Sequence, residues 1–424
     1  MKKIFFLISS LFTIIPFKIN SVAKKLDKEK NKVDNVLELG KDIDKSNAKD
    51  SSGKYKHNIS NFFVIGDSLS DVNGLTTFVE QRIKALKLNA ELIIKGDAYG
   101  FYKDEKFFNC FSNGPTAAFL LAEKLGIKCL KPSNIYSEGV NGFGNSYAVA
   151  GATAGKLNTN SGTFLNDVRI DIQARALIQQ HKINKNDLVF FEIGGNDLAY
   201  IVKLIQIGED YTSYLEDATE RIKIALFSLL NNGIKNILFM TPPPIEFPPI
   251  FQDIMSKKEY ILIKEVILLA TDQFYKNIIE VLELTNEHYK NCVHLFDLYK
   301  NTDFLKNKFY KTFWFKKKKL ALEMINTSAT NWEEVEVELT IGEQTRSING
   351  VRDLISLLPE LIFASKKANN KILIQINSAK FNDPINFDCY FFVDKLHPNK
   401  NVHYIVFKIL YKKVKKIMKH SKNK

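Results

Sequence analysis

The sequence predicts an α/β fold in which helices cover both faces of a parallel β-sheet. Short apolar runs with many β-branched and aromatic residues recur along the chain, and stretches with helical spacing separate them. Runs that are apolar throughout are typical of strands buried on both faces, and their alternation with helices is typical of parallel sheets. The expected strands are 61–65, 187–193, 235–241 and 292–298, and the clearest helices are 218–230 and 260–284.

The pattern changes between about 310 and 388. A run of lysines is followed by residues 333–340 and 371–377, in which apolar and polar residues alternate as in half-exposed strands. We expect this stretch to be an insertion into the main domain, forming a small β-rich subdomain or a lid. A lysine-rich helix follows at 401–424; it either packs on the sheet with its lysines in solvent or contacts a membrane surface.

The N-terminal residues predict export. Two lysines precede the apolar stretch 4–17, which is too short to span a bilayer, and small residues follow up to Ala23. This is the pattern of a secretory signal peptide over residues 1–23, so we expect a secreted or periplasmic protein. Residues 24–57 are densely charged and nearly lack aromatics, which predicts a flexible linker and leaves 58–424 as the folded domain.

The charge of the chain leaves two interpretations open. The formal net charge is +13 and the pI about 9.2, and lysine supplies most of the positive charge. A genome biased toward Lys, Asn and Ile would produce this composition. Alternatively, the lysines attract the protein to anionic membranes, where each one near the surface contributes roughly 1 kcal/mol. A nucleic-acid partner is not expected, because arginine is scarce and no nucleic-acid-binding motif is present.

Four cysteines are present, and their number allows disulfides in an exported protein. One possible pairing is Cys110 with Cys129 and Cys292 with Cys389; the alternative is four buried thiols. The cysteine spacing does not fit a zinc site, and the sequence predicts no metal and no other cofactor.

A candidate nucleophile follows the first predicted strand directly, in the segment Gly66-Asp67-Ser68. Ligands of parallel α/β sheets bind beyond the carboxyl ends of the strands, so Ser68 stands where chemistry is expected. Glycine permits a sharp turn that would raise the hydroxyl above the strand end, close to the first N–H groups of a following helix. Asp and Ser are also common helix caps, so this segment alone would not identify a catalytic site.

A second candidate segment follows an apolar run far downstream, with Asp394 and His397 separated by two residues. A short turn could direct both side chains toward one site. Asp394 could then orient His397 and stabilise its protonated form, while His397 acts as the base for a serine hydroxyl. The alternative for His397 is a surface-loop histidine, although the chain has only seven histidines.

These two segments and two others resemble the motif blocks of the GDSL, or SGNH, family of serine hydrolases. The blocks occur in the order of the family and span about residues 61 to 405. The resemblance implies a three-layer SGNH-hydrolase-like fold, with a parallel sheet between helices. The four blocks are Gly66–Asp71, Tyr147–Thr153, Ile193–Asp197 and Asp394–Pro398.

The resemblance also implies a role for each site residue. Ser68 would be the nucleophile, His397 the general base and acid, and Asp394 the residue that orients the histidine. The oxyanion hole would consist of the backbone N–H groups of Ser68 and Gly151 and the side-chain amide of Asn196. Without the family, Gly151 could be a simple bend and Asn196 a cap or turn residue.

Finer features resemble the bacterial branch of thermolabile hemolysins, phospholipases A and glycerophospholipid–cholesterol acyltransferases. The segments 111–115 and 241–244 resemble that branch, whereas Ala150 and the pair Asn73-Gly74 depart from it. We therefore expect an exported serine hydrolase of acyl esters, with phospholipids as substrates and acyl transfer as a further activity. The alternatives are a carbohydrate or short-chain acetylesterase on the same fold, and a secreted binding protein that has lost activity.

Overall fold

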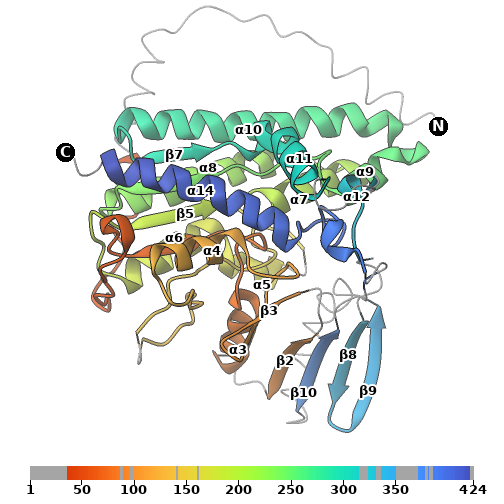
Figure 1. Cartoon of the computed structure of the whole chain (residues 1–424), viewed down its shortest axis with the longest axis horizontal. Helices are drawn as coiled ribbons and strands as arrows, with labels where there is room; N and C mark the ends of the chain where they lie inside the picture. Colours follow the sequence, from red (N-terminus) through yellow and green to blue (C-terminus); the bar gives the residue numbers. More distant parts are fainter. Residues whose placement is uncertain are drawn as a thin grey trace, which may run out of the picture.

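Four parallel strands form the central sheet of the protein, in the order β1-β5-β6-β7 (Figure 1). A parallel bridge between Val64 and Ser146 adds a further short segment beside β1. All four strands lie in the runs predicted from the sequence, so the predicted parallel sheet is confirmed. The strands are β1 (Phe62–Ile65), β5 (Leu188–Glu192), β6 (Asn236–Met240) and β7 (Val293–Phe296).

The structure is a computed structural model. The predicted signal peptide, residues 1–23, lies outside the residues that it describes and stays a prediction. The described residues are 36–85, 89–95, 99–139, 142–159, 162–314, 323–330, 336–349, 371–377, 381 and 385–420.

Helices cover both faces of the central sheet, as the sequence predicts. Alternate strand residues point to opposite faces: Phe63 and Ile65 enter one core, whereas Phe62 and Val64 enter the other. The first core is covered by α6 (Ile170–Gln180), α7 (Gly195–Ile207), α8 (Thr212–Asn231) and α10 (Ile261–His288). The second is covered by α4 (Ala117–Leu125), α11 (Leu298–Trp314) and α14 (Lys400–His420).

A second sheet lies beside the main domain, in the order β2-β10-β8-β9 (Figure 1). Three of its strands come from the predicted insertion, but β2 comes from the first quarter of the chain and pairs in parallel with β10. The insertion is therefore not a separate subdomain, because its sheet is completed by a strand that precedes it by more than two hundred residues. The strands are β2 (Ala90–Lys95), β8 (Glu336–Ile341), β9 (Gln344–Asn349) and β10 (Ile372–Asn377).

The second sheet packs on residues that lead to the candidate site. Its buried side chains, among them Leu339 and Ile374, form one apolar cluster with Val79, Tyr99 and Val393. The remaining elements are α3 (Gly74–Ala85), β3 (Phe101–Lys103), β4 (Lys106–Phe108), α5 (Gly162–Leu165), α9 (Pro249–Ser256), α12 (Glu323–Asn326) and the 3₁₀ turns η1 (Lys56–Asn58), η2 (Asn166–Val168), η3 (Lys258–Tyr260) and η5 (Phe387–Cys389).

The prediction of a flexible linker is wrong for residues 36–57, which pack against the main domain. Val36 and Ile43 are buried, although the surrounding residues are charged. The backbone N–H of Lys49 donates to Gln180 (3.0 Å), and its carbonyl accepts from Lys182 (3.0 Å). A few apolar anchors and backbone hydrogen bonds thus hold a segment whose composition indicates disorder.

Of the two alternatives for the cysteines, the structure supports thiols rather than the pairs Cys110–Cys129 and Cys292–Cys389, but only Cys110 and Cys389 are buried. All four cysteines belong to the described part of the chain, and no disulfide joins them. Cys110 is buried and its thiol faces carbonyl oxygens of its own loop. Cys292 precedes β7 at the amino-terminal edge of the central sheet, whereas Cys389 lies in the loop before Asp394, at the opposite edge.

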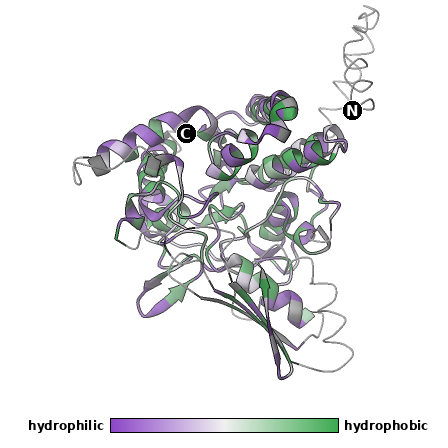
Figure 2. Ribbon diagram, turned by 90° about the vertical axis from the view of Figure 1, so that its right-hand side faces the viewer, coloured by the Kyte–Doolittle hydropathy of each residue, from purple (hydrophilic) through white to green (hydrophobic). Residues whose placement is uncertain are grey.

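The C-terminal helix α14 packs on the sheet through one face, where Leu410 and Val414 are fully buried. Lys408, Lys412 and Lys415 are exposed on its outer face, and Figure 2 shows hydrophilic residues along this helix near the C-terminus. Within the part of the chain that the structure describes, we find no helix whose length and apolar content would let it span a bilayer.

We predict that Leu339→Ala loosens the second sheet without loosening the central one. Leu339 is fully buried in that sheet, and such truncations cost about 2–5 kcal/mol. Hydrogen–deuterium exchange should accelerate at β8 and β10 and stay unchanged at β5 and β6. The exposed Arg346→Ala on β9 is the control. Equal acceleration in both sheets would show that they unfold as one unit.

Candidate active site

Ser68 lies in a tight turn directly beyond β1. The turn begins at Gly66, whose φ of 157° and close approach to the backbone of Glu192 leave no room for a Cβ. The N–H groups of Ser70 and Asp71 then donate to the carbonyl of Asp67. Because α3 begins only at Gly74, the N–H groups near Ser68 belong to this turn and not to a helix, which differs from the sequence expectation.

His397 and Asp394 lie within hydrogen-bonding distance of Ser68 in the predicted order. His397 Nε2 is 2.8 Å from Ser68 Oγ, and His397 Nδ1 is 2.7 Å from Asp394 Oδ2. All three side chains are buried: Ser68 is 7%, His397 3% and Asp394 0% exposed. The structure thus brings together three residues that are separated by up to 329 positions in the chain.

Asp394 is held as a carboxylate despite its complete burial. Burial alone would raise its pKa, but the charge of His397 and hydrogen bonds from His397 and Tyr99 together lower the pKa below its ordinary value. Its Oδ1 accepts from the backbone N–H groups of Leu396 (2.7 Å) and His397 (2.6 Å). A carboxylate in this position favours the His397 tautomer with the proton on Nδ1, leaving Nε2 as the acceptor for Ser68.

Of the three residues expected to form an oxyanion hole, Ser68 and Asn196 line the pocket, and Gly151 lies in the loop that hydrogen bonds tie to both segments. Gly151 has a φ of 82°, a conformation that favours glycine. Asn196 lies in the first turn of α7 and lines the pocket beside Ser68. Its amide nitrogen donates one hydrogen to the carbonyl of Ala152 (2.9 Å), and an amide carries a second hydrogen that is available for a ligand.

Buried carboxylates hold the segments of this site together. Asp71 accepts from the backbone of Ala150 (2.6 Å), which ties the Ser68 turn to the Gly151 loop. Asp197 accepts from the N–H groups of Ala154 and Gly155, which ties the same loop to α7. Ala150 does not have a positive φ, so alanine fits at this position, where the sequence departs from the usual glycine.

A buried carboxyl pair, Asp67 and Glu192, lies beside the Ser68 turn. Burial raises the pKa of Asp67 to about 6. It raises the pKa of Glu192 well above the ordinary value, and the charge of Asp67 adds to this. Both shifts favour the protonated form of Glu192, which avoids two adjacent negative charges beside Ser68.

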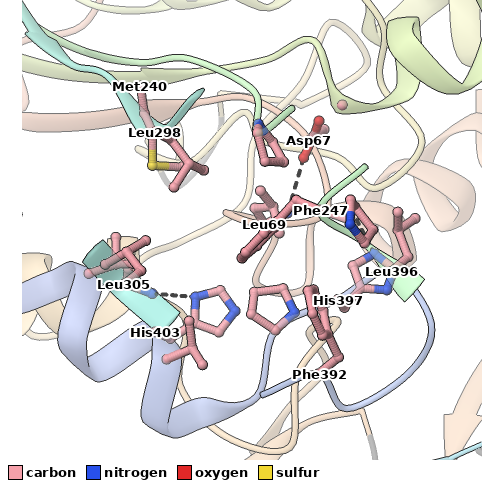
Figure 3. Close-up of a pocket in the computed structure, with 18 of the residues that line it drawn as sticks. Asp67, Leu69, Met240, Phe247, Leu298, Leu305, Phe392, Leu396, His397 and His403 are labelled. Atoms are coloured by element: carbon pink, nitrogen blue, oxygen red, sulfur yellow. Dashed lines mark hydrogen bonds between the residues drawn. The ribbon is translucent and has the colours of Figure 1, made fainter. Parts of the chain in front are cut away.

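Ser68 and His397 open into a pocket with a largely apolar lining (Figure 3). The pocket encloses about 930 Å³ of empty space, part of it open to solvent. The Pro-rich loop after β6, the segment 391–398, helix α11 and helix α14 all contribute to the wall. The apolar lining residues include Leu69, Met240, Pro243, Pro244, Ile245, Phe247, Phe251, Leu298, Leu305, Phe391, Phe392, Leu396, Val402 and Val406.

A family model for GDSL-like lipases and acylhydrolases matches residues 62–410, which is most of the chain. The chain belongs to this family. A search of curated protein sequences found no match. Membership in the GDSL family makes the protein an ester hydrolase of the lipase or esterase class, whereas the finer branch expected from the sequence stays a prediction.

The GDSL motif blocks did not point to Tyr99, which the structure places beside Asp394. The Tyr99 hydroxyl donates to Asp394 Oδ2 (2.6 Å), the same oxygen that contacts His397. The Phe111 ring lies against both Tyr99 and His397, with ring centroids 5.7 and 5.2 Å apart. No sequence signal marks Tyr99, because it lies almost three hundred positions before Asp394 and meets it only in the folded chain.

The segment around Phe111, singled out in the sequence, also holds the loop that carries His397. The hydroxyl of Ser112 donates to the carbonyl of Pro398 (3.1 Å), and Asn113 Oδ1 accepts from the backbone of Lys400 (2.9 Å). Among the described residues of this GDSL domain, no group of three or more His, Cys, Asp and Glu side chains is placed to hold a metal ion.

We predict that Tyr99→Phe lowers kcat of ester hydrolysis by about 10- to 100-fold with little change in KM. A hydrogen bond to a charged group contributes about 1.5–3 kcal/mol, and this one stabilises Asp394 rather than the substrate. Its loss raises the pKa of Asp394, so activity should disappear at a higher pH on the acid side. The matched control is Tyr102→Phe, whose side chain is 77% exposed. An unchanged pH profile would contradict the role of Tyr99.

Proposed function

We propose that the protein hydrolyses acyl esters through Ser68, with phospholipids as its substrates. The observation that carries this proposal is the hydrogen-bonded series from Ser68 through His397 to Asp394 at the mouth of an apolar pocket. A serine hydroxyl requires such a base to act as a nucleophile. Family membership supports the ester substrate, and the apolar lining supports a long acyl chain.

In the proposed reaction, His397 Nε2 takes the proton of Ser68 as its oxygen attacks the ester carbonyl carbon. Asp394 stabilises the imidazolium that forms. The tetrahedral intermediate then collapses, and His397 returns the proton to the oxygen of the leaving alcohol. His397 then takes a proton from water as the water oxygen attacks the acyl-serine, and it returns this proton to Ser68 Oγ as the fatty acid leaves. An alcohol in place of water would give acyl transfer.

The oxyanion is proposed to accept hydrogen bonds from the backbone N–H groups of Ser68 and Gly151 and from the side chain of Asn196. Donors held in place before the reaction stabilise the charge that develops on the carbonyl oxygen, and each is typically worth a factor of about 10²–10³ in rate. The hydrogen bond of Asn196 to Ala152 supports this role, because it fixes the amide in orientation.

The alternative substrates fit the pocket less well. A carbohydrate ester would require several hydrogen-bonding groups around the sugar, whereas apolar side chains dominate the lining. A binding protein without activity would not need the complete series of contacts among Ser68, His397 and Asp394. The N-terminal residues support an exported enzyme that is secreted or periplasmic.

We predict that Ser68→Ala lowers the hydrolysis of p-nitrophenyl esters by about 10⁴-fold or more and abolishes labelling by a fluorophosphonate probe. Circular dichroism should show an unchanged fold, since the change removes one hydroxyl group. Ser70→Ala is the control: this hydroxyl lies in the same turn but donates to Glu192, so labelling should persist. A wild-type protein that the probe does not label would favour the inactive binding protein.

We also propose a peripheral contact with anionic membranes through the exposed lysines of α14, in agreement with the net charge of +13. Binding to anionic vesicles should weaken as salt rises, because the Debye length falls from about 10 Å at 0.1 M to about 3 Å at 1 M. Only lysines near the lipid surface contribute to this contact, and each contributes roughly 1 kcal/mol to the free energy of binding.

We predict that Lys412→Gln with Lys415→Gln weakens co-sedimentation with anionic vesicles by about tenfold or more, in a Ser68→Ala background that cannot digest lipid. The matched control is Lys264→Gln with Lys276→Gln on α10, which removes the same charge from another helix. Equal losses from both pairs would attribute binding to net charge alone. Equal binding of the parent protein to neutral and anionic vesicles would exclude the electrostatic contact.

A further inference from the structure

His403 is an unusual residue in the wall of the apolar pocket. The other polar side chains that line it belong to the Ser68 turn (residues 67–70) or are those of Asn196 and His397, all at the catalytic end. His403 projects from α14 near Leu305 (Figure 3), in the wall that Val402 and Val406 also line, and the residue is only 4% exposed. An apolar residue would complete this wall, so packing does not explain a histidine.

The hydrogen bond at Nδ1 of the His403 ring determines whether Nε2 is a donor or an acceptor. The backbone N–H of Ala117, at the start of α4, donates to His403 Nδ1 (3.2 Å). Nδ1 is therefore an acceptor and carries no proton. Burial, together with the smaller effect of the charge of His397, lowers the pKa of His403 to about 3, so the ring is neutral at neutral pH. A neutral imidazole has one N–H, which must be on Nε2.

This Nε2–H has no hydrogen-bond partner among the described residues. Figure 3 shows the bonded nitrogen of His403 on the side away from His397 and the other nitrogen on the side toward it. Buried donors are almost always satisfied, by protein, water or ligand. The largely apolar wall on the α14 side thus carries a fixed, uncharged donor in the same pocket as Ser68.

We propose that the pocket selects acyl groups that bear an oxygen along the chain, as a hydroxyl or a keto group, and that this oxygen accepts a hydrogen bond from His403 Nε2–H. The inference rests on the proposed function of the same site and names its substrate more closely. A donor requires an acceptor on the ligand. Because His403 is neutral and its surroundings are apolar, that acceptor is an uncharged oxygen rather than a carboxylate, which would be costly to bury there.

The unpaired donor is expected to make the pocket prefer acyl chains with an oxygen over acyl chains without one. A chain without an oxygen leaves the Nε2–H unpaired once it displaces water from the pocket. Sites that contain a buried polar group reject ligands that lack its partner more strongly than apolar pockets reject an extra group. The oxygenated acyl group is therefore the better substrate, provided that its oxygen stands at the correct distance from the ester carbonyl.

The test compares p-nitrophenyl octanoate with its hydroxy and keto derivatives, in which the oxygen moves one carbon at a time along the chain. For the wild-type protein we expect kcat/KM to rise by about tenfold or more at one oxygen position relative to the other positions. In His403→Asn this peak should disappear. Asparagine keeps an oxygen that can accept from Ala117, but it places no N–H at the position of Nε2.

Val406→Ala is the matched control, since it changes the same wall one helical turn away and removes no polar atom. It should alter the preference for chain length and leave the peak at the same oxygen position. A wild-type protein with no preferred position overturns the proposal even if His403→Asn fails to fold. A peak that persists in His403→Asn also overturns it. A wild-type protein that cleaves neither the parent ester nor its derivatives contradicts the proposed function instead.

Discussion

The hydrogen bonds to the buried carboxylate of Asp394 are the constraint on which the rest of the site depends. An isolated carboxylate in this position would be protonated, because burial disfavours its charge. Two backbone N–H groups, the imidazole of His397 and the hydroxyl of Tyr99 keep it ionised. Its charge then sets the tautomer of His397, and the tautomer determines whether Ser68 has a base to receive its proton.

Two sheets converge on this carboxylate from different directions. In the central sheet, β1 ends at the turn of Ser68 and β5 ends shortly before Asn196, so this sheet positions both residues. The second sheet packs on Val393 and places Tyr99, while the backbone N–H of Thr330 donates to the carbonyl of Val393 (2.9 Å). The strands of the insertion therefore pack against the segment that carries Asp394 and help to hold it in place.

The central sheet and the segments of Ser68 and His397 could be predicted from the sequence, because each is marked by a local pattern of residues. Buried strands are continuous apolar runs, and the segments of Ser68 and His397 follow such runs directly. Tyr99 and the mixed origin of the second sheet could not be predicted, since the pairing of β2 with β10 joins segments far apart in the chain and leaves no periodic trace. Residues 36–57 were misjudged because Val36 and Ile43 are too few to change a composition that indicates disorder.

The pairing of β2 with β10 also determines when the site can form during synthesis. The ribosome releases Ser68 early, and the central sheet has all its strands once residue 296 has emerged. Tyr99 gains its support only after residue 377, and Asp394, His397 and α14 follow later still. A growing chain can thus fold most of its core while its serine has no base beside it. Ester hydrolysis is therefore postponed until translation is nearly complete.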